Sequence, residues 1–150
     1  MELAATKRSF WWMSSHADHE TETAMSYLQR INYRPTLDAL SERERDMLGR
    51  AFDPASTDVI INGDVVPWHN VEEVEVAVAA RQKGPSGWIV RNLVMQGERY
   101  HVALYFGREE QVLTNLSRGA AEYVVKSIAY YAPKPVRYTG PDGFAPLTEV

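Results

Sequence analysis

Residues 88–113 carry the clearest alternation of hydrophobic and polar positions in the chain. Over Tyr100–Phe106 every second residue is a large apolar one, and this period of two is typical of a strand with one buried face. The run Trp88–Met95 has the composition of a strand, and Gln96-Gly97 between the two runs can form a tight turn. The pattern predicts an antiparallel hairpin, followed by a third strand around Val112-Leu113.

A second hairpin and a longer strand are predicted upstream. Val59–Ile61 and Asp64–Trp68 flank Asn62-Gly63, a dipeptide that strongly favours a two-residue hairpin turn. Pro67 makes the second of these strands short or places it at an edge. Val71–Val78 is the longer strand, with valines at alternate positions from Val74 onward. Two of its glutamates are expected to face water: Glu73 and Glu75.

The clearest helical pattern extends from Ser117 to Ala132. Apolar residues recur there with the i, i+3, i+4, i+7 spacing of a helix with one buried face: Ala121, Val124, Val125, Ile128 and Tyr131. Ser117 is a suitable N-cap, and Pro133 prevents continuation. We expect this helix to pack on the sheet with Ser127 on its other side. The tail beyond it, rich in proline and glycine, is expected to run extended over the surface.

Two shorter helices are predicted in the N-terminal third. Glu20–Asn32 has apolar residues at helical spacing along a narrow stripe. The second helix begins at Thr36 or Ser41 and ends at Phe52, with the Ser41–Glu44 spacing of a capping box. Asp53–Ser56 then forms a candidate boundary. It divides the chain into an aromatic arm with two helices (1–55) and an antiparallel β domain with a C-terminal helix and an extended tail (56–150).

Composition limits the class of protein. The chain has 150 residues, of which 45% are hydrophobic and 24% charged, enough for one ordinary globular domain with a core. A formal net charge of -4 disfavours general binding to nucleic acid. No apolar run approaches the roughly 20 residues that span a bilayer, and the N-terminus has no signal-peptide core. The absence of cysteine excludes disulfides and thiolate chemistry and is consistent with a cytoplasmic protein.

Phe10, Trp11, Trp12 and Met13 form the densest aromatic segment of the chain. Side chains this large need something to cover them. Either the segment folds back into a groove of its own domain, or it anchors the chain in a protein partner or a second copy, since Trp is enriched among interface hot spots. Membrane contact is disfavoured, although Trp beside basic residues also suits a membrane interface. These four residues are the candidate partner-binding site.

Few residues point to chemistry. His16–Glu20 contains two histidines and two carboxylates, but a polar linker commonly has this composition, and neither a metal site nor another cofactor is predicted. His101 and Tyr105 share one face of their strand, and Arg91 is expected within cross-strand reach. The three could bind a small anionic ligand or transfer protons. They could equally form ordinary cross-strand pairs, and no residue is assigned a catalytic role.

The order of these elements resembles the bacterial pleckstrin-homology-like domains over roughly residues 57–132. The resemblance covers the Val59–Gly63 hairpin leading to Pro67-Trp68, the glutamate-valine strand, the later hairpin and the C-terminal helix. It implies a scaffold that often presents a surface to peptides or partner proteins. No lipid-binding residue is carried over, because the first loop, Asn62–Asp64, has no basic cluster.

The expected fold is therefore α+β. An antiparallel, strongly curved sheet or partial barrel is capped by the C-terminal helix and preceded by an N-terminal helical arm. The expected function is a non-enzymatic protein-interaction or assembly module, acting on a protein partner or by self-association. The alternative is a small-ligand-binding protein or enzyme that uses the sheet face around His101 and Tyr105.

Overall fold

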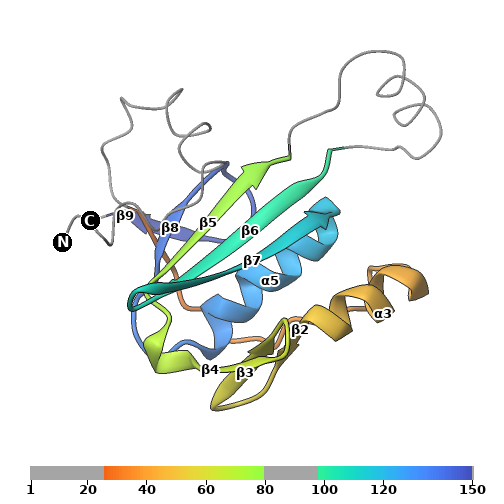
Figure 1. Cartoon of the computed structure of the whole chain (residues 1–150). Helices are drawn as coiled ribbons and strands as arrows, with labels where there is room; N and C mark the ends of the chain where they lie inside the picture. The colour runs from red at the N-terminus through yellow and green to blue at the C-terminus, as the bar shows by residue number, and fades with distance from the viewer. Residues whose placement is uncertain (1–25, 80–97, 150) are drawn as a thin grey trace.

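The computed structural model of the protein describes residues 26–79 and 98–149 and shows an α+β fold (Figure 1). The α-helices in these ranges are α3 (Glu42–Ala51) and α5 (Arg118–Tyr131). The strands are β1 (Ser26–Leu28), β2 (Phe52–Pro54), β3 (Asp58–Ile61), β4 (Asp64–Pro67), β5 (Glu73–Val78), β6 (Tyr100–Phe106), β7 (Glu109–Leu116), β8 (Arg137–Thr139) and β9 (Leu147–Glu149).

The strands form two sheets. The larger has the order β7-β6-β5-β8-β1-β9, and the smaller has the order β2-β3-β4. All neighbours are antiparallel except β5 and β8, which are parallel. Neither sheet closes on itself within the described residues, so the two sheets do not show the expected partial barrel.

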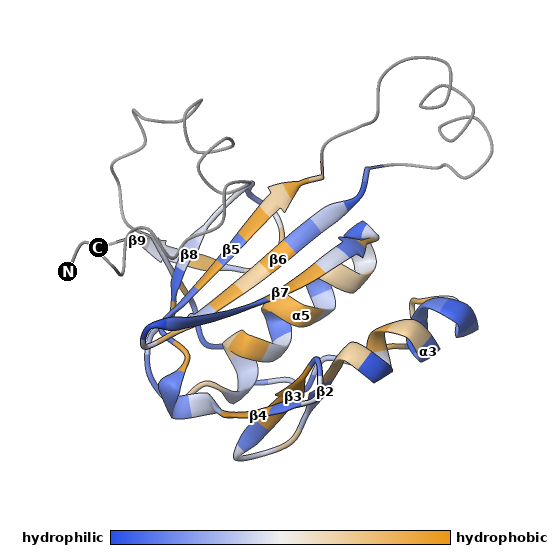
Figure 2. Ribbon diagram, viewed as in Figure 1, coloured by the Kyte–Doolittle hydropathy of each residue, from blue (hydrophilic) through white to orange (hydrophobic). Residues whose placement is uncertain are grey.

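One hydrophobic core lies between the large sheet and α5. Figure 2 shows hydrophobic residues along β5, β6 and α5. Val74 and Val76 of β5 and the alternate apolar residues of β6 lie in this core, and Val74, Val102, Leu104, Val124 and Ile128 are fully buried. Burial of each such side chain stabilises the fold by about 1.5–3 kcal/mol before the entropy of ordering is subtracted. Leu48 and Phe52 belong to the same core as Val59 and Ile61, so residues on both sides of position 55 share it.

Several predicted elements are confirmed. Ser117 caps α5 by accepting a hydrogen bond from the Ala120 amide, and the helix ends before Pro133. Ser41 caps α3 in the same way through the Glu44 amide, as the capping-box spacing predicts. Asn62 and Gly63 both have positive φ, which is the geometry of a type I′ turn, and they join β3 to β4. Ser127, however, is fully buried, because α5 is covered more widely than its apolar stripe indicated.

The predicted helix over 20–32 is wrong for its described part. Ser26–Leu28 is a strand that pairs with β8 on one side and β9 on the other. Leu28 and Ile31 are buried. The apolar stripe therefore identifies core residues correctly, but these residues belong to a strand and the segment after it, not to a helix. Phe52–Pro54, expected to end a helix, is likewise a strand paired with β3.

The C-terminal tail does not run over the surface as expected. Arg137–Thr139 is an internal strand between β5 and β1, and Val136, Tyr138 and Phe144 are buried. Proline and glycine occur in the connections around these short strands rather than within a surface tail. The pairing partners of the tail are far away in sequence, and no local pattern indicates them.

The expected hairpin partner of β6, residues 88–95, lies outside the described residues. Within them, β6 pairs with β5 along one edge and with β7 along the other. Both edges are therefore occupied, and the predicted pairing of 88–95 with β6 is wrong. The turn from β6 to β7 agrees with the prediction, with Gly107 at positive φ and Phe106 opposite Glu109.

Gly140→Ala should destabilise the protein. Gly140 follows β8 with φ of +147°, and a Cβ there would lie 2.6 Å from the Val76 carbonyl oxygen of the neighbouring strand. We expect a loss of about 1–3 kcal/mol, seen as a fall in Tm of about 3–10 °C in a thermal melt. Gly49→Ala is the matched control, because a Cβ in α3 meets nothing within 4 Å and should raise stability by about 0.5–1 kcal/mol. A Gly140→Ala variant as stable as the wild type would contradict this packing of β8.

Candidate functional site

The face of the large sheet opposite α5 carries titratable side chains of β5 and β6: Glu73, Glu75, His101 and Tyr105. Tyr105 on β6 donates its hydroxyl hydrogen to Glu75 Oε1 on β5 at 3.0 Å. Both side chains are buried, Tyr105 with 8% and Glu75 with 3% of its surface exposed. A hydrogen bond between a hydroxyl and a buried carboxylate is charge-assisted, so this pair is a firm structural contact.

Glu73 and Glu75 do not face water as expected. β5 is a central strand flanked by β6 and β8, and side chains from both neighbours reach its glutamates. Tyr105 hydrogen-bonds to Glu75, and Arg137 on β8 places Nη2 3.9 Å from Glu73 Oε1. The alternation was assigned correctly, but a polar face in the middle of a sheet is not necessarily a solvated one.

His101 supports an irregularity in the sheet. The register of β6 and β7 shifts between Tyr100 and Val102, and Asn115 on β7 has positive φ. At this bulge the Asn115 amide donates to His101 Nδ1 at 3.3 Å. Burial lowers the pKa of His101, in agreement with a neutral ring that accepts a hydrogen bond at Nδ1. The His101 ring thus provides a hydrogen-bond acceptor for the Asn115 amide at the bulge, where the regular β6–β7 hydrogen bonding is interrupted.

Two residues of the candidate ligand site, His101 and Tyr105, lie within the described part of the chain. His101 and Tyr105 share a face, but His101 lies opposite Ala77 and Tyr105 lies opposite Glu73. His101 accepts from the Asn115 amide and Tyr105 donates to Glu75, whereas Arg91 lies outside the described residues. Phe10–Met13 and His16–Glu20 also lie outside them. Within 26–79 and 98–149, no cluster of His, Cys, Asp or Glu could hold a metal ion.

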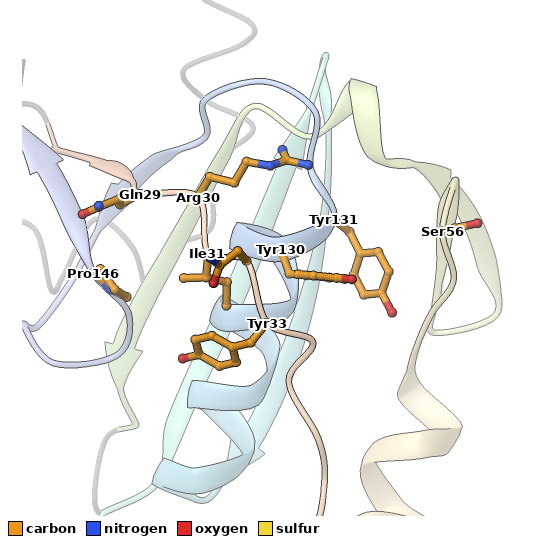
Figure 3. A pocket seen from close by; sticks show the side chains of 9 residues that line it. Gln29, Arg30, Ile31, Tyr33, Ser56, Tyr130, Tyr131 and Pro146 are labelled. Carbon is orange, nitrogen blue, oxygen red and sulfur yellow. The ribbon is translucent and has the colours of Figure 1, made fainter.

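The most distinctive surface feature is an open hollow at the C-terminal end of α5 (Figure 3). It has a volume of about 770 Å³. We call it the tyrosine hollow. Four separate parts of the chain line it, with the residues Gln29, Arg30, Ile31, Asn32, Tyr33, Ser56, Tyr130, Tyr131 and Pro146. Tyr33 is the most exposed of its aromatic residues, with 52% of its surface accessible.

The wall formed by residues 29–31 is fixed by three hydrogen bonds. The Gln29 amide donates to the Pro146 carbonyl at 2.9 Å, and the Ile31 amide donates to the Ala129 carbonyl at 3.4 Å. The Arg30 guanidinium donates through Nη1 to the Ala132 carbonyl at 2.6 Å, satisfying a carbonyl at the end of α5. Arg30 therefore holds its planar group in a defined position beside the hollow.

The aromatic wall is equally ordered. The Tyr130 and Tyr131 rings are nearly perpendicular, with centroids 4.8 Å apart. Tyr131 in turn stacks on the buried Trp68 at 5.3 Å, and the Trp68 indole N–H donates to the Ala55 carbonyl at 2.7 Å. Such contacts fix the rings before any ligand arrives.

Only part of this hollow is indicated by the sequence pattern. Tyr131 was expected in the apolar stripe of its helix, whereas Tyr130 and Tyr33 were not singled out. Two adjacent tyrosines at a helix end are a usable signal, because one of them must point away from the buried face. Their meeting with Arg30 depends on β1, which was predicted as a helix.

A second, smaller groove of about 560 Å³ lies between α3 and β7. Met47, with 56% of its surface exposed, lines it. The turn between β3 and β4 covers part of the β7 edge, because the Asn62 side-chain amide donates to Gln111 Oε1 at 3.0 Å and to the Val112 carbonyl at 3.2 Å. This groove is therefore interrupted where an added strand would pair.

Comparisons of the chain with protein-family models, with curated proteins and with solved structures found no match. Every helix in the described part of the chain is too short or too polar to cross a membrane.

The lowered pKa of His101 predicts a pH dependence of stability. The unfolded chain takes up a proton near the ordinary pKa of 6.5, above the pKa of the folded state. The contribution of neutral His101 to the free energy of unfolding is therefore complete above about pH 6.5. It is lost as the pH falls toward the pKa of His101 in the folded state. The fall in Tm between pH 7.5 and pH 5 should be smaller in His101→Asn, which keeps an acceptor for the Asn115 amide but does not titrate. Equal falls in both proteins would contradict the burial effect.

Tyr105→Phe should cost about 1.5–3 kcal/mol, because it removes a donor from the buried Glu75 carboxylate. The measurement is urea unfolding at pH 7. In a Glu75→Gln background the same substitution should cost less, since the charge that strengthens the hydrogen bond is gone. Additive effects of the two substitutions would show that the pair does not interact.

Proposed function

We propose that the protein is a non-enzymatic interaction module that binds a segment of a protein partner in the tyrosine hollow. The observation that carries this proposal is the grouping of Tyr33, Tyr130 and Tyr131 with Arg30 in one open, preformed hollow. Tyrosine and arginine are the residue types enriched at interface hot spots, together with tryptophan.

The shape supports a polypeptide ligand over a small molecule. Small-molecule sites enclose most of their ligand, whereas this hollow is open on one side. Its lining alternates aromatic rings with the polar groups of Gln29, Asn32 and Ser56, which can bond to a peptide backbone. Because Tyr131 and Arg30 are already held in place, binding costs little side-chain entropy.

The sheet face around His101 and Tyr105 is less suited to a ligand. His101 Nδ1 accepts the Asn115 amide, and the Tyr105 hydroxyl donates to Glu75. A ligand or a proton-transfer step at either group would compete with a contact of the fold.

Selection of peptides from a library of random linear sequences, with the full chain as bait, tests this function. Selected peptides should be rich in aromatic residues, and Tyr33→Ser and Tyr130→Ser should each weaken their binding by about tenfold or more in fluorescence anisotropy. Val65→Ser is the control, since Val65 is 62% exposed on the smaller sheet and does not line the hollow.

Two results would overturn the proposal. One is a selection that yields no binding peptide. The other is a set of peptides whose affinity is lowered by Val65→Ser and unchanged by both tyrosine substitutions, because binding would then lie on the smaller sheet.

A further inference from the structure

We infer that the chain's own aromatic segment, Phe10–Met13, occupies the tyrosine hollow of the same molecule and competes there with partner segments. This inference rests on the proposed function. It joins the densest cluster of large aromatics in the sequence to a hollow lined by Tyr33, Tyr130 and Tyr131.

The position at which the described chain begins favours this occupant. Ser26 starts β1, and the wall of the hollow begins at Gln29, three residues further, a distance of at most about 10 Å along an extended chain. Residues 14–25 connect Met13 to Ser26, and a chain of this length spans up to roughly 40 Å. The segment therefore reaches the hollow without any change in β1.

The same tether explains why the segment belongs to the same molecule and not to a second copy. A ligand joined to its site by a short connection acts at an effective concentration on the order of 1 mM. A second copy at micromolar concentration offers the same side chains at a far lower concentration. Docking within one molecule therefore prevails unless a second copy makes additional contacts.

The chemistry of the segment matches the lining of the hollow. Indole and phenyl rings pack edge to face with tyrosine, in the arrangement that Tyr130 and Tyr131 already show with each other. The guanidinium of Arg30, held by the Ala132 carbonyl, offers a planar cation to the face of an indole. Met13 adds a thioether, which packs well against aromatic edges.

Competition follows from this arrangement. A partner segment must displace Phe10–Met13 before it binds, so its apparent affinity is lower than its intrinsic affinity for the empty hollow. Partners are then selected for aromatic residues that match or exceed those of the internal segment. The N-terminal segment sets the threshold for binding.

The test uses a fluorescein-labelled synthetic peptide with the sequence of residues 6–17, added to the full chain. A Trp11→Ala/Trp12→Ala variant lacks the internal competitor and should bind the peptide about tenfold more tightly than the wild type. Adding Tyr33→Ser to that variant should abolish the gain, whereas adding Val65→Ser should not. Light scattering should find both the wild type and the double variant to be monomers.

The outcomes separate this inference from the proposed function. Equal affinity of the peptide for the wild type and the double variant overturns it, as does a dimer of the wild type that becomes a monomer in the double variant. If the double variant fails to bind the peptide while peptides selected from the library bind the hollow, the inference is wrong and the proposed function stands. If no selected peptide binds either, the proposed function fails as well.

Discussion

The parallel pairing of β8 with β5 is the constraint on which the rest of the fold depends. It places Arg137, Val74 and Tyr138 in the middle of the large sheet and requires Gly140 to pass close to the Val76 carbonyl. The other edge of β8 pairs with β1, and the free edge of β1 pairs with β9. The segment after β1 reaches the end of α5 only through this chain of pairings. The tyrosine hollow is therefore a consequence of a strand that looks, in the sequence, like a tail.

The same pairing explains why the polar sheet face is not an obvious catalytic site. β5 has neighbours on both sides, so Glu73 and Glu75 lie among side chains that hydrogen-bond to them or pair with them. His101 stabilises the bulge in β6 and β7. Titratable groups with structural partners can resemble an active site in a sequence, because residue type alone does not show what each group contacts.

Sequence reasoning succeeded where the signal is local. Asn62-Gly63, the Ser41 and Ser117 caps and the stripe of α5 each specify a conformation within a few residues. It failed where the signal is distant. Ser26–Leu28 is too short to show a strand period, and Arg137–Thr139 is identified as a strand only by partners on β5 and β1. Of the candidate site, His101 and Tyr105 were placed on the correct face, but the meeting of Arg30 with Tyr130 could not be foreseen while 20–32 was assigned to a helix.

The hollow is built at a seam between distant parts of the chain, and this has a thermodynamic consequence. β1 is three residues long, and the segment after it is held to α5 and to the C-terminal tail by individual hydrogen bonds. Short elements of this kind open at a lower free energy than the central strands. A ligand in the hollow contacts both residues 29–33 and the end of α5. It therefore stabilises the state in which β1 and the segment after it are attached to the fold, by an amount that grows with ligand occupancy. Binding and the attachment of β1 are therefore linked, whether the ligand is a partner segment or the chain's own aromatics.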